Sequence, residues 1–84
     1  MPYDVRFTGV ARKDVLKLSP RLKRKLRDIL IGQIAKDPFS GKKLVGDLEG
    51  LFSIRLTFKD RIVYSIDAAH RVVYIHRART HYGD

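Results

Sequence analysis

The chain has 84 residues, 44% of them hydrophobic, and it contains no cysteine. This length allows one small domain, spanning residues 1–84, with a single core. The absence of cysteine excludes a disulfide framework and a thiolate metal site. Eighteen Lys and Arg against nine Asp and Glu give a net charge of +9, which favours nucleic acid or an acidic protein segment as the partner. No apolar run is long enough for a signal core or a membrane span, so we expect a cytoplasmic protein that does not engage membranes.

The N-terminal residues predict a strand followed by a short helix. Apolar and charged side chains alternate over residues 3–7, which is the period of a strand. Thr8 carries the hydroxyl typical of an N-cap, and we expect a helix from there through Leu18. Its expected core contacts are Val10, Val15 and Leu18.

A second, longer helix is predicted from Ser19 to Lys36. Serine is a favoured N-cap, and Pro20 fits the first turn because its missing N–H has no helical partner there. Apolar side chains recur at helical spacing along one side: Leu22, Leu26, Ile29, Leu30 and Ile34. The other side carries mostly basic side chains: Arg21, Lys23, Arg24, Lys25, Arg27 and Asp28. This basic side is either a solvated face or a track for RNA. Asp37–Pro38 ends the helix.

The second half of the chain predicts a loop and three strands. Residues 39–50 are rich in Gly and Lys, as in a loop, and alternation of apolar and polar residues then predicts strands at 52–58, 61–66 and 72–76. The predicted fold is α+β: an N-terminal strand, a two-helix hairpin and a three-stranded antiparallel meander, with the helices on one sheet face. The other face stays partly open, and an RNA strand could lie on it over Ser53, Arg55 and Arg61.

The last residues combine basic side chains with side chains that transfer protons. Arg77 and Arg79 precede the adjacent pair His81 and Tyr82. Arginine can hold a phosphate and histidine exchanges protons near neutral pH, so this stretch has the chemistry of an RNA-cleaving site. The alternative interpretation is a solvated basic tail.

Three segments resemble a known family. Residues 37–42 read D-P-F-S-G-K, residues 48–64 read L-E-G-L-F-S-I-R-L-T-F-K-D-R-I-V-Y, and residues 79–82 read R-T-H-Y. In this order and spacing they are similar to segments of the RelE/ParE superfamily of bacterial toxins, above all to its RelE and YoeB/Txe branches. The resemblance implies a RelE-like fold and a ribosome-dependent mRNA endoribonuclease. It also implies a small acidic antitoxin, bound in a toxin–antitoxin hetero-oligomer, with the toxin itself a monomer or homodimer.

One segment departs from the family pattern. YoeB-like toxins carry a catalytic glutamate in a P-E-P-L segment of the loop, whereas residues 41–44 here read G-K-K-L. Lys42 or Lys43 therefore stands at the position of the acid, and RelE-type toxins work with basic residues instead. Glu49 is a nearby candidate base, or simply a carboxylate in a turn.

Cleavage of RNA by its own 2′-hydroxyl requires removal of that proton, charge compensation on the phosphate and protonation of the leaving oxygen. Arg61 and Arg55 suit the phosphate, because guanidinium pairs with phosphate oxygens in bidentate geometry. His81 is the expected proton carrier, and Tyr82 would orient the phosphate or stack on a base. The remaining basic residues of the predicted site would bind RNA through their charge: Lys42, Lys43, Arg77 and Arg79.

Two other functions remain open on the sequence. One is a ParE-like toxin that binds DNA gyrase without cutting nucleic acid, although a binder needs no proton carrier such as His81. The other is an RNA-binding family member without catalysis, which the missing loop glutamate favours. We expect no cofactor and no metal, because His76 and His81 lack a third ligand at useful spacing. Neither His70 nor His76 receives a role.

Overall fold

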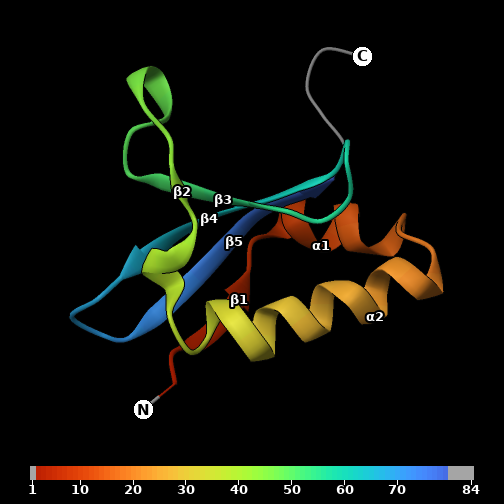
Figure 1. Ribbon diagram of the computed structural model, residues 1–84, viewed down its shortest axis with the longest axis horizontal. Coiled ribbons are helices and arrows are strands. Elements are labelled where there is room, and N and C mark those ends of the chain that lie inside the picture. Colours follow the sequence, from red (N-terminus) through yellow and green to blue (C-terminus); the bar gives the residue numbers. More distant parts are fainter. Residues whose placement is uncertain (1, 80–84) are drawn as a thin grey trace.

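The first and last strands of the described chain lie side by side. The computed structural model describes residues 2–79 (Figure 1). Strand β1 (Asp4–Phe7) pairs in parallel with β5 (Val72–Arg79). The sheet continues through β4 (Arg61–Asp67), β3 (Leu51–Arg55) and the two-residue β2 (Lys42–Lys43), all paired antiparallel. The five strands therefore run in the order β1-β5-β4-β3-β2.

The helices begin where the sequence predicts them. Helix α1 (Gly9–Leu16) is capped by the Thr8 hydroxyl, which accepts the Ala11 N–H at 3.1 Å. Helix α2 (Pro20–Ile29) is capped by Ser19, whose hydroxyl accepts the Leu22 N–H at 3.2 Å. Both helices lie on one side of the sheet (Figure 1), so the predicted α+β fold with helices on one sheet face is confirmed.

The second helix continues beyond Ile29 in a wider form. Residues Leu30–Ile34 form a π-helical turn, η1, which closes with the Ala35 N–H donating to the Leu30 carbonyl at 2.8 Å. Leu26, Leu30 and Ile34 are buried against the sheet, as their spacing predicts. The predicted core contact of Val10 is wrong, because that side chain is 51% exposed.

Tyr64 lies at the centre of the core. Its ring stacks on Phe52, with the ring centroids 5.7 Å apart, and its hydroxyl donates to the Pro38 carbonyl at 2.7 Å. Burial raises the pKa of Tyr64 to about 12. A Cβ at Gly41 would collide with the Tyr64 hydroxyl, so glycine is required there by this close approach. The turn after η1 therefore packs closely against the Tyr64 hydroxyl, through the Pro38 carbonyl and Gly41.

The loop and the strand after it differ from the prediction. Within the predicted loop the structure forms β2 and two short 3-10 turns, η2 (Pro38–Ser40) and η3 (Gly46–Leu48). Strand β3 ends at Arg55, and not at residue 58, because the chain turns around Asp60. The Asp60 carbonyl accepts the Leu56 N–H at 2.8 Å, and its carboxylate accepts the Thr57 hydroxyl at 2.8 Å. Phe58, which continues the apolar alternation, is 82% exposed in this turn.

Helix α1 covers the part of the β5 edge that β1 leaves open. The pairing with β1 ends at Ile75, opposite Phe7. Beyond it the buried carboxylate of Asp14 accepts the Ala78 N–H at 3.1 Å and the Arg77 Nε–H at 2.9 Å. This carboxylate supplies the hydrogen bond that a neighbouring strand would otherwise provide to the edge.

We predict that Asp14→Ala lowers the free energy of unfolding by about 3 kcal/mol, because it leaves a buried N–H without an acceptor and Arg77 without its counter-charge. Asp14→Asn retains an acceptor oxygen, so its free energy of unfolding should fall by less than that of Asp14→Ala. Urea unfolding of both variants, with the exposed Asp28→Ala as the control, measures the differences. An Asp14→Ala protein as stable as the control would contradict this role.

Candidate nucleic-acid interface

Three arginines lie in one row at an end of the open sheet face. Arg55 in β3 pairs with Arg61 in β4, which pairs in turn with Arg79 in β5. Residues that pair directly across antiparallel strands point to the same face, with Cβ atoms about 5 Å apart. Among residues 2–79, these three arginines have no carboxylate within salt-bridge distance. Like charges placed this way destabilise a sheet, whereas a bound anion would relieve the repulsion.

A second row follows directly behind the arginines. It consists of Lys42, Ser53, Val63 and Arg77, each paired with the next across β2, β3, β4 and β5. Ser53 is only 3% exposed, and its hydroxyl has no hydrogen-bond partner within the described chain. Buried polar groups are nearly always paired. The unpaired hydroxyl of Ser53 lies in the row between Lys42 and Val63, and Arg77 follows Val63 in the same row.

The structure separates the other predicted site residues. Lys43 pairs with Phe52, so it lies one position out of the row that holds Lys42. Glu49 is exposed and follows η3, at the end of β3 opposite to Arg55. The length of β3 alone separates the two ends by about 13 Å. Glu49 is therefore not brought together with the arginine row.

The C-terminal residues of the predicted site divide into two groups. Arg77 is anchored to Asp14 by two hydrogen bonds, from Nε at 2.9 Å and from Nη2 at 3.4 Å. Arg79 is exposed at the end of β5. His81 and Tyr82 lie outside the described residues. Sequence reasoning missed Asp14, although an acid on the buried side of a short helix is a signal for a buried ion pair.

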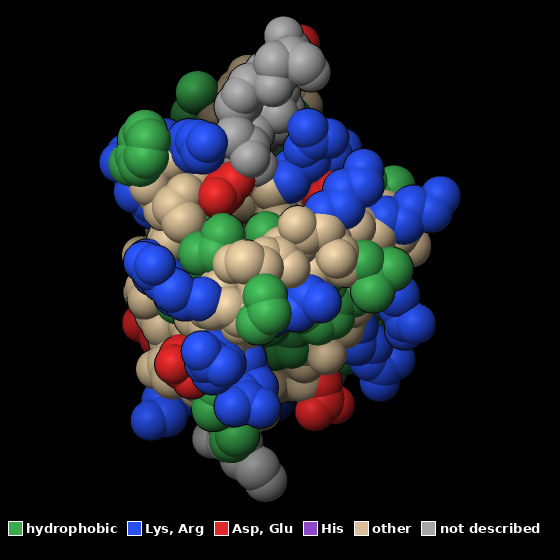
Figure 2. Space-filling view, turned by 90° about the vertical axis from the view of Figure 1, so that its right-hand side faces the viewer, with side chains coloured by type: hydrophobic (Ala, Val, Ile, Leu, Met, Phe, Trp, Pro, Cys, Tyr) green, Lys and Arg blue, Asp and Glu red, His purple; other side chains and the backbone are tan. Residues whose placement is uncertain are grey.

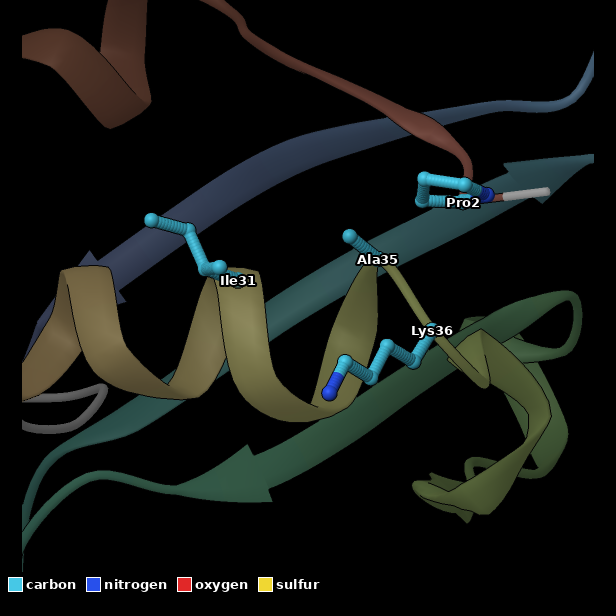
Figure 3. Close-up of a pocket in the computed structure, with 4 residues that line it drawn as sticks. All are labelled: Pro2, Ile31, Ala35 and Lys36. Atoms are coloured by element: carbon cyan, nitrogen blue, oxygen red, sulfur yellow. The ribbon is translucent and has the colours of Figure 1, made fainter.

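Two shallow hollows lie away from the arginine row. One, of about 400 Å³, is lined by Pro2, Ile31, Ala35 and Lys36, where the N-terminal residues pass the end of η1 (Figure 3). The other, of about 430 Å³, is lined by Phe7, Arg12, Val15 and Leu16. Neither lining contains a carboxylate, a histidine or a hydroxyl nucleophile. Their chemistry suits the docking of apolar groups better than catalysis.

Basic and apolar side chains share the side of the molecule that carries the turn between α1 and α2. Figure 2 shows Lys and Arg side chains around exposed hydrophobic ones on this side. Leu16 in α1 is 75% exposed and Val10 is 51% exposed. Within residues 2–79 no group of three potential metal ligands occurs, and no helix is long and apolar enough to cross a membrane.

Comparison with known proteins gives one consistent family. Residues 7–82 match the model of the YoeB-like toxins of bacterial type II toxin–antitoxin systems. The chain is 42% identical to the toxin RelG of Mycobacterium tuberculosis over 79 residues, which cover 92% of this chain and 88% of that protein. It is 39% identical to the toxin RelE of the same organism over 80 residues, which cover 93% and 81% of the two chains.

Solved structures agree with this assignment. The fold matches the toxin–antitoxin complex RelBE2 of Mycobacterium tuberculosis with a TM-score of 0.87 and 38% identity, covering 96% of this chain and 100% of that one. A YoeB/ParE toxin from Agrobacterium tumefaciens matches with a TM-score of 0.82 and 27% identity, covering 94% and 99%. The resemblance predicted from the three sequence segments is confirmed, and the chain belongs to the YoeB-like toxins of bacterial type II toxin–antitoxin systems.

Proposed function

We propose that this toxin cleaves mRNA on the ribosome, by attack of a ribose 2′-hydroxyl on the adjacent phosphate. The observation that carries the proposal is the row of Arg55, Arg61 and Arg79 across three neighbouring strands. Guanidinium groups bind phosphate oxygens in bidentate geometry and stabilise the charge that develops in the transition state. A ribosome-directed enzyme would act in the cytoplasm.

The second row extends the phosphate site. In this proposal Lys42 adds positive field. The hydroxyl of Ser53 is buried, so it would reach a phosphate oxygen only after a neighbouring side chain moves aside. Arg77 keeps further N–H donors for RNA, because its bonds to Asp14 use only two of its nitrogen atoms. Lys43 pairs with the core residue Phe52 and therefore points away from this face, so it would contribute only to the overall positive charge. The sheet face would thus compensate phosphate charge without a carboxylate in either row.

Proton transfer is assigned to the C-terminal pair. His81 follows Arg79 by two positions, and imidazole titrates nearest to neutral pH of all side chains. In this proposal His81 carries the proton, and Tyr82 orients the phosphate or stacks on a base. Glu49 lies at the wrong end of β3 for the general base, so an acid–base pair built on it is disfavoured. The ribosome would position the message for a site that is mainly cationic.

The same site distinguishes cleavage from two other functions. A gyrase-binding toxin of the ParE type, or an RNA-binding protein without catalysis, would require no proton carrier beside the arginines. New 5′ ends inside translated frames, mapped by primer extension in cells that express the toxin, would appear only if the protein cleaves message. Their absence in cells that stop growing would favour the gyrase alternative.

We predict that Arg61→Ala lowers the cleavage rate roughly ten- to thousand-fold, which corresponds to about 1 to 4 kcal/mol of lost transition-state stabilisation. The fold should remain intact, because Arg61 is not part of the buried core. Primer extension in a translation reaction measures the rate. The control is Arg24→Ala, which removes the same charge from the exposed face of α2. This variant should cleave message at the normal rate. Equal loss in both variants would show a general charge effect instead.

We predict that His81→Gln lowers cleavage about a hundred- to ten-thousand-fold, the usual cost of losing a general acid or base. Tyr82→Phe should have a milder effect if Tyr82 mainly stacks on a base. Deletion of both residues should abolish cleavage and leave binding to ribosomes largely unchanged. Single-turnover cleavage and ribosome co-sedimentation measure the two properties. A folded deletion variant that still cuts at the normal rate would remove this pair from the site.

We further propose that a small acidic antitoxin binds this protein in a hetero-oligomer. The related structure RelBE2 is a toxin–antitoxin complex, which supports an antitoxin partner. The +9 charge and the exposed hydrophobic residues of α1 support a partner with acidic and apolar side chains. Encounter should slow at least tenfold from about 0.01 M to 1 M salt, because the screening length falls from about 30 Å to 3 Å.

Stopped-flow association with the acidic protein encoded beside the toxin gene measures this dependence. An antitoxin whose carboxylates are replaced by amides is the control, and it should associate at a rate that salt hardly changes. The pairing proposal fails if no acidic protein is encoded there and none co-purifies with the toxin.

A further inference from the structure

A third row of residues lies on the open face, behind the two basic rows. Strand β5 alternates across the sheet, and Val73 and Ile75 are fully buried in the core. Tyr74 therefore points to the open face, where 36% of it is exposed. Its register partners are Ser65 in β4 and Arg6 in β1. The row thus places an aromatic ring between a hydroxyl and a guanidinium group.

A β-bulge brings a histidine onto the same part of the face. The register shifts between Val63 and Tyr64, which pair with Arg77 and Ile75, so His76 has no direct partner in the ladder. Its Nε2 lies 2.8 Å from the Ser65 hydroxyl. Whichever of the two groups donates, the imidazole keeps its Nδ1 and the hydroxyl keeps two positions for further hydrogen bonds.

The charge of the open face changes sign beyond Tyr74. The next row contains Asp67, Val72 and Asp4, paired across β4, β5 and β1. Acidic side chains repel phosphate, so a nucleic acid strand is not expected to continue past this row. In the other direction, Ser65 lies four residues from Arg61 on the same face of β4, a distance of about 13 Å along the strand. The face is therefore a short track with one basic end and one end that carries Asp4 and Asp67, although the Asp67 carboxylate also contacts the His70 ring at 2.9 Å.

We propose that this track holds a second nucleotide subsite, in which the Tyr74 ring stacks on an RNA base near the cleaved phosphate. Arg6 would bind the backbone of that nucleotide, and the His76–Ser65 pair would contact the edge of its base. The inference rests on the proposed RNA cleavage, because the arginine row would fix the strand that reaches Tyr74. Stacking on an exposed aromatic ring beside cationic groups is how open sheets hold single strands.

Arg6 supports this assignment over a purely structural role of the row. It is exposed, and among residues 2–79 it has no carboxylate within salt-bridge distance. An exposed tyrosine alone would fit any strand, since aromatic residues favour the sheet conformation. The combination of an aromatic ring, an unpaired arginine and a histidine–serine pair, limited by an acidic row, fits a nucleotide more closely.

The test measures the affinity of the full-length toxin for a short single-stranded RNA that carries 2′-deoxy sugars to prevent cleavage. Tyr74→Ala should weaken binding about five- to hundred-fold, the typical loss of one stacked base. Tyr74→Phe, which keeps the ring, should bind within about twofold of the wild type, because stacking uses the ring face. Leu16→Ala, on α1 at the other side of the sheet, is the control for loss of an exposed apolar side chain.

An abasic scan then places the subsite. One base at a time is removed from the RNA, and wild-type affinity should fall most at one position. Tyr74→Ala should be insensitive to base removal at that position and respond normally at the others. Equal affinity of Tyr74→Ala and wild type, or additive losses at every position, would overturn the inference.

The outcomes separate this inference from the proposed function. If the wild type cleaves message and Arg61→Ala does not, while Tyr74→Ala behaves as wild type, the second subsite alone fails. If the wild type produces no new 5′ ends, the proposed nuclease fails, whatever Tyr74→Ala does to RNA binding. A Tyr74→Ala variant that loses antitoxin binding or self-association but retains RNA affinity would make this row a protein interface and overturn the subsite.

Discussion

The carboxylate of Asp14 connects the first helix of the chain to its last strand. Because β1 pairs only as far as Ile75, the end of β5 lacks a strand neighbour on that side. Asp14 accepts the Ala78 N–H and holds the Arg77 guanidinium there. Asp14 thereby fixes the backbone of β5 next to Arg79, which points to the open face. Asp14 and Arg77 are 63 positions apart in the sequence. A phosphate site on this strand requires such a fixed backbone, since small displacements of binding groups are costly in catalysis.

Two of the family segments meet at Tyr64. The segment at residues 37–42 supplies the Pro38 carbonyl that accepts the Tyr64 hydroxyl, and Gly41 leaves the space which that hydroxyl fills. The segment at residues 48–64 supplies Tyr64 itself and its stacking partner Phe52. Side chains alternate within this second segment, so Arg61 faces outward while Tyr64 faces the core. One short motif therefore provides both the anchor of the fold and a candidate phosphate ligand.

The open sheet face contains two features that destabilise the free protein. Like charges stand opposite one another in the row of Arg55, Arg61 and Arg79, and the Ser53 hydroxyl is buried without a partner in residues 2–79. Each feature is unfavourable in the free protein. Local conflicts of this kind concentrate at functional sites, where a ligand resolves them. The buried side of the sheet, covered by α1 and α2, compensates through apolar packing.

The sequence by itself determined the two helices, their N-caps at Thr8 and Ser19, four of the five strands and the family, because caps, periodicity and motif order are local properties of the chain. It did not predict β2 or the π-helical turn at Leu30–Ile34. The strand predicted at residues 52–58 is longer than β3, which ends at Arg55. The apolar alternation continues to Phe58, but the backbone has left the strand there and forms the turn that is held by Asp60. Only the tertiary structure decided which residues stand beside one another. Periodicity tells which face of a strand a side chain occupies, but the register between strands depends on turns and bulges. The arginine row, the separation of Glu49 from it, and the bond between Asp14 and Arg77 all follow from that register and from the packing of α1 on β5.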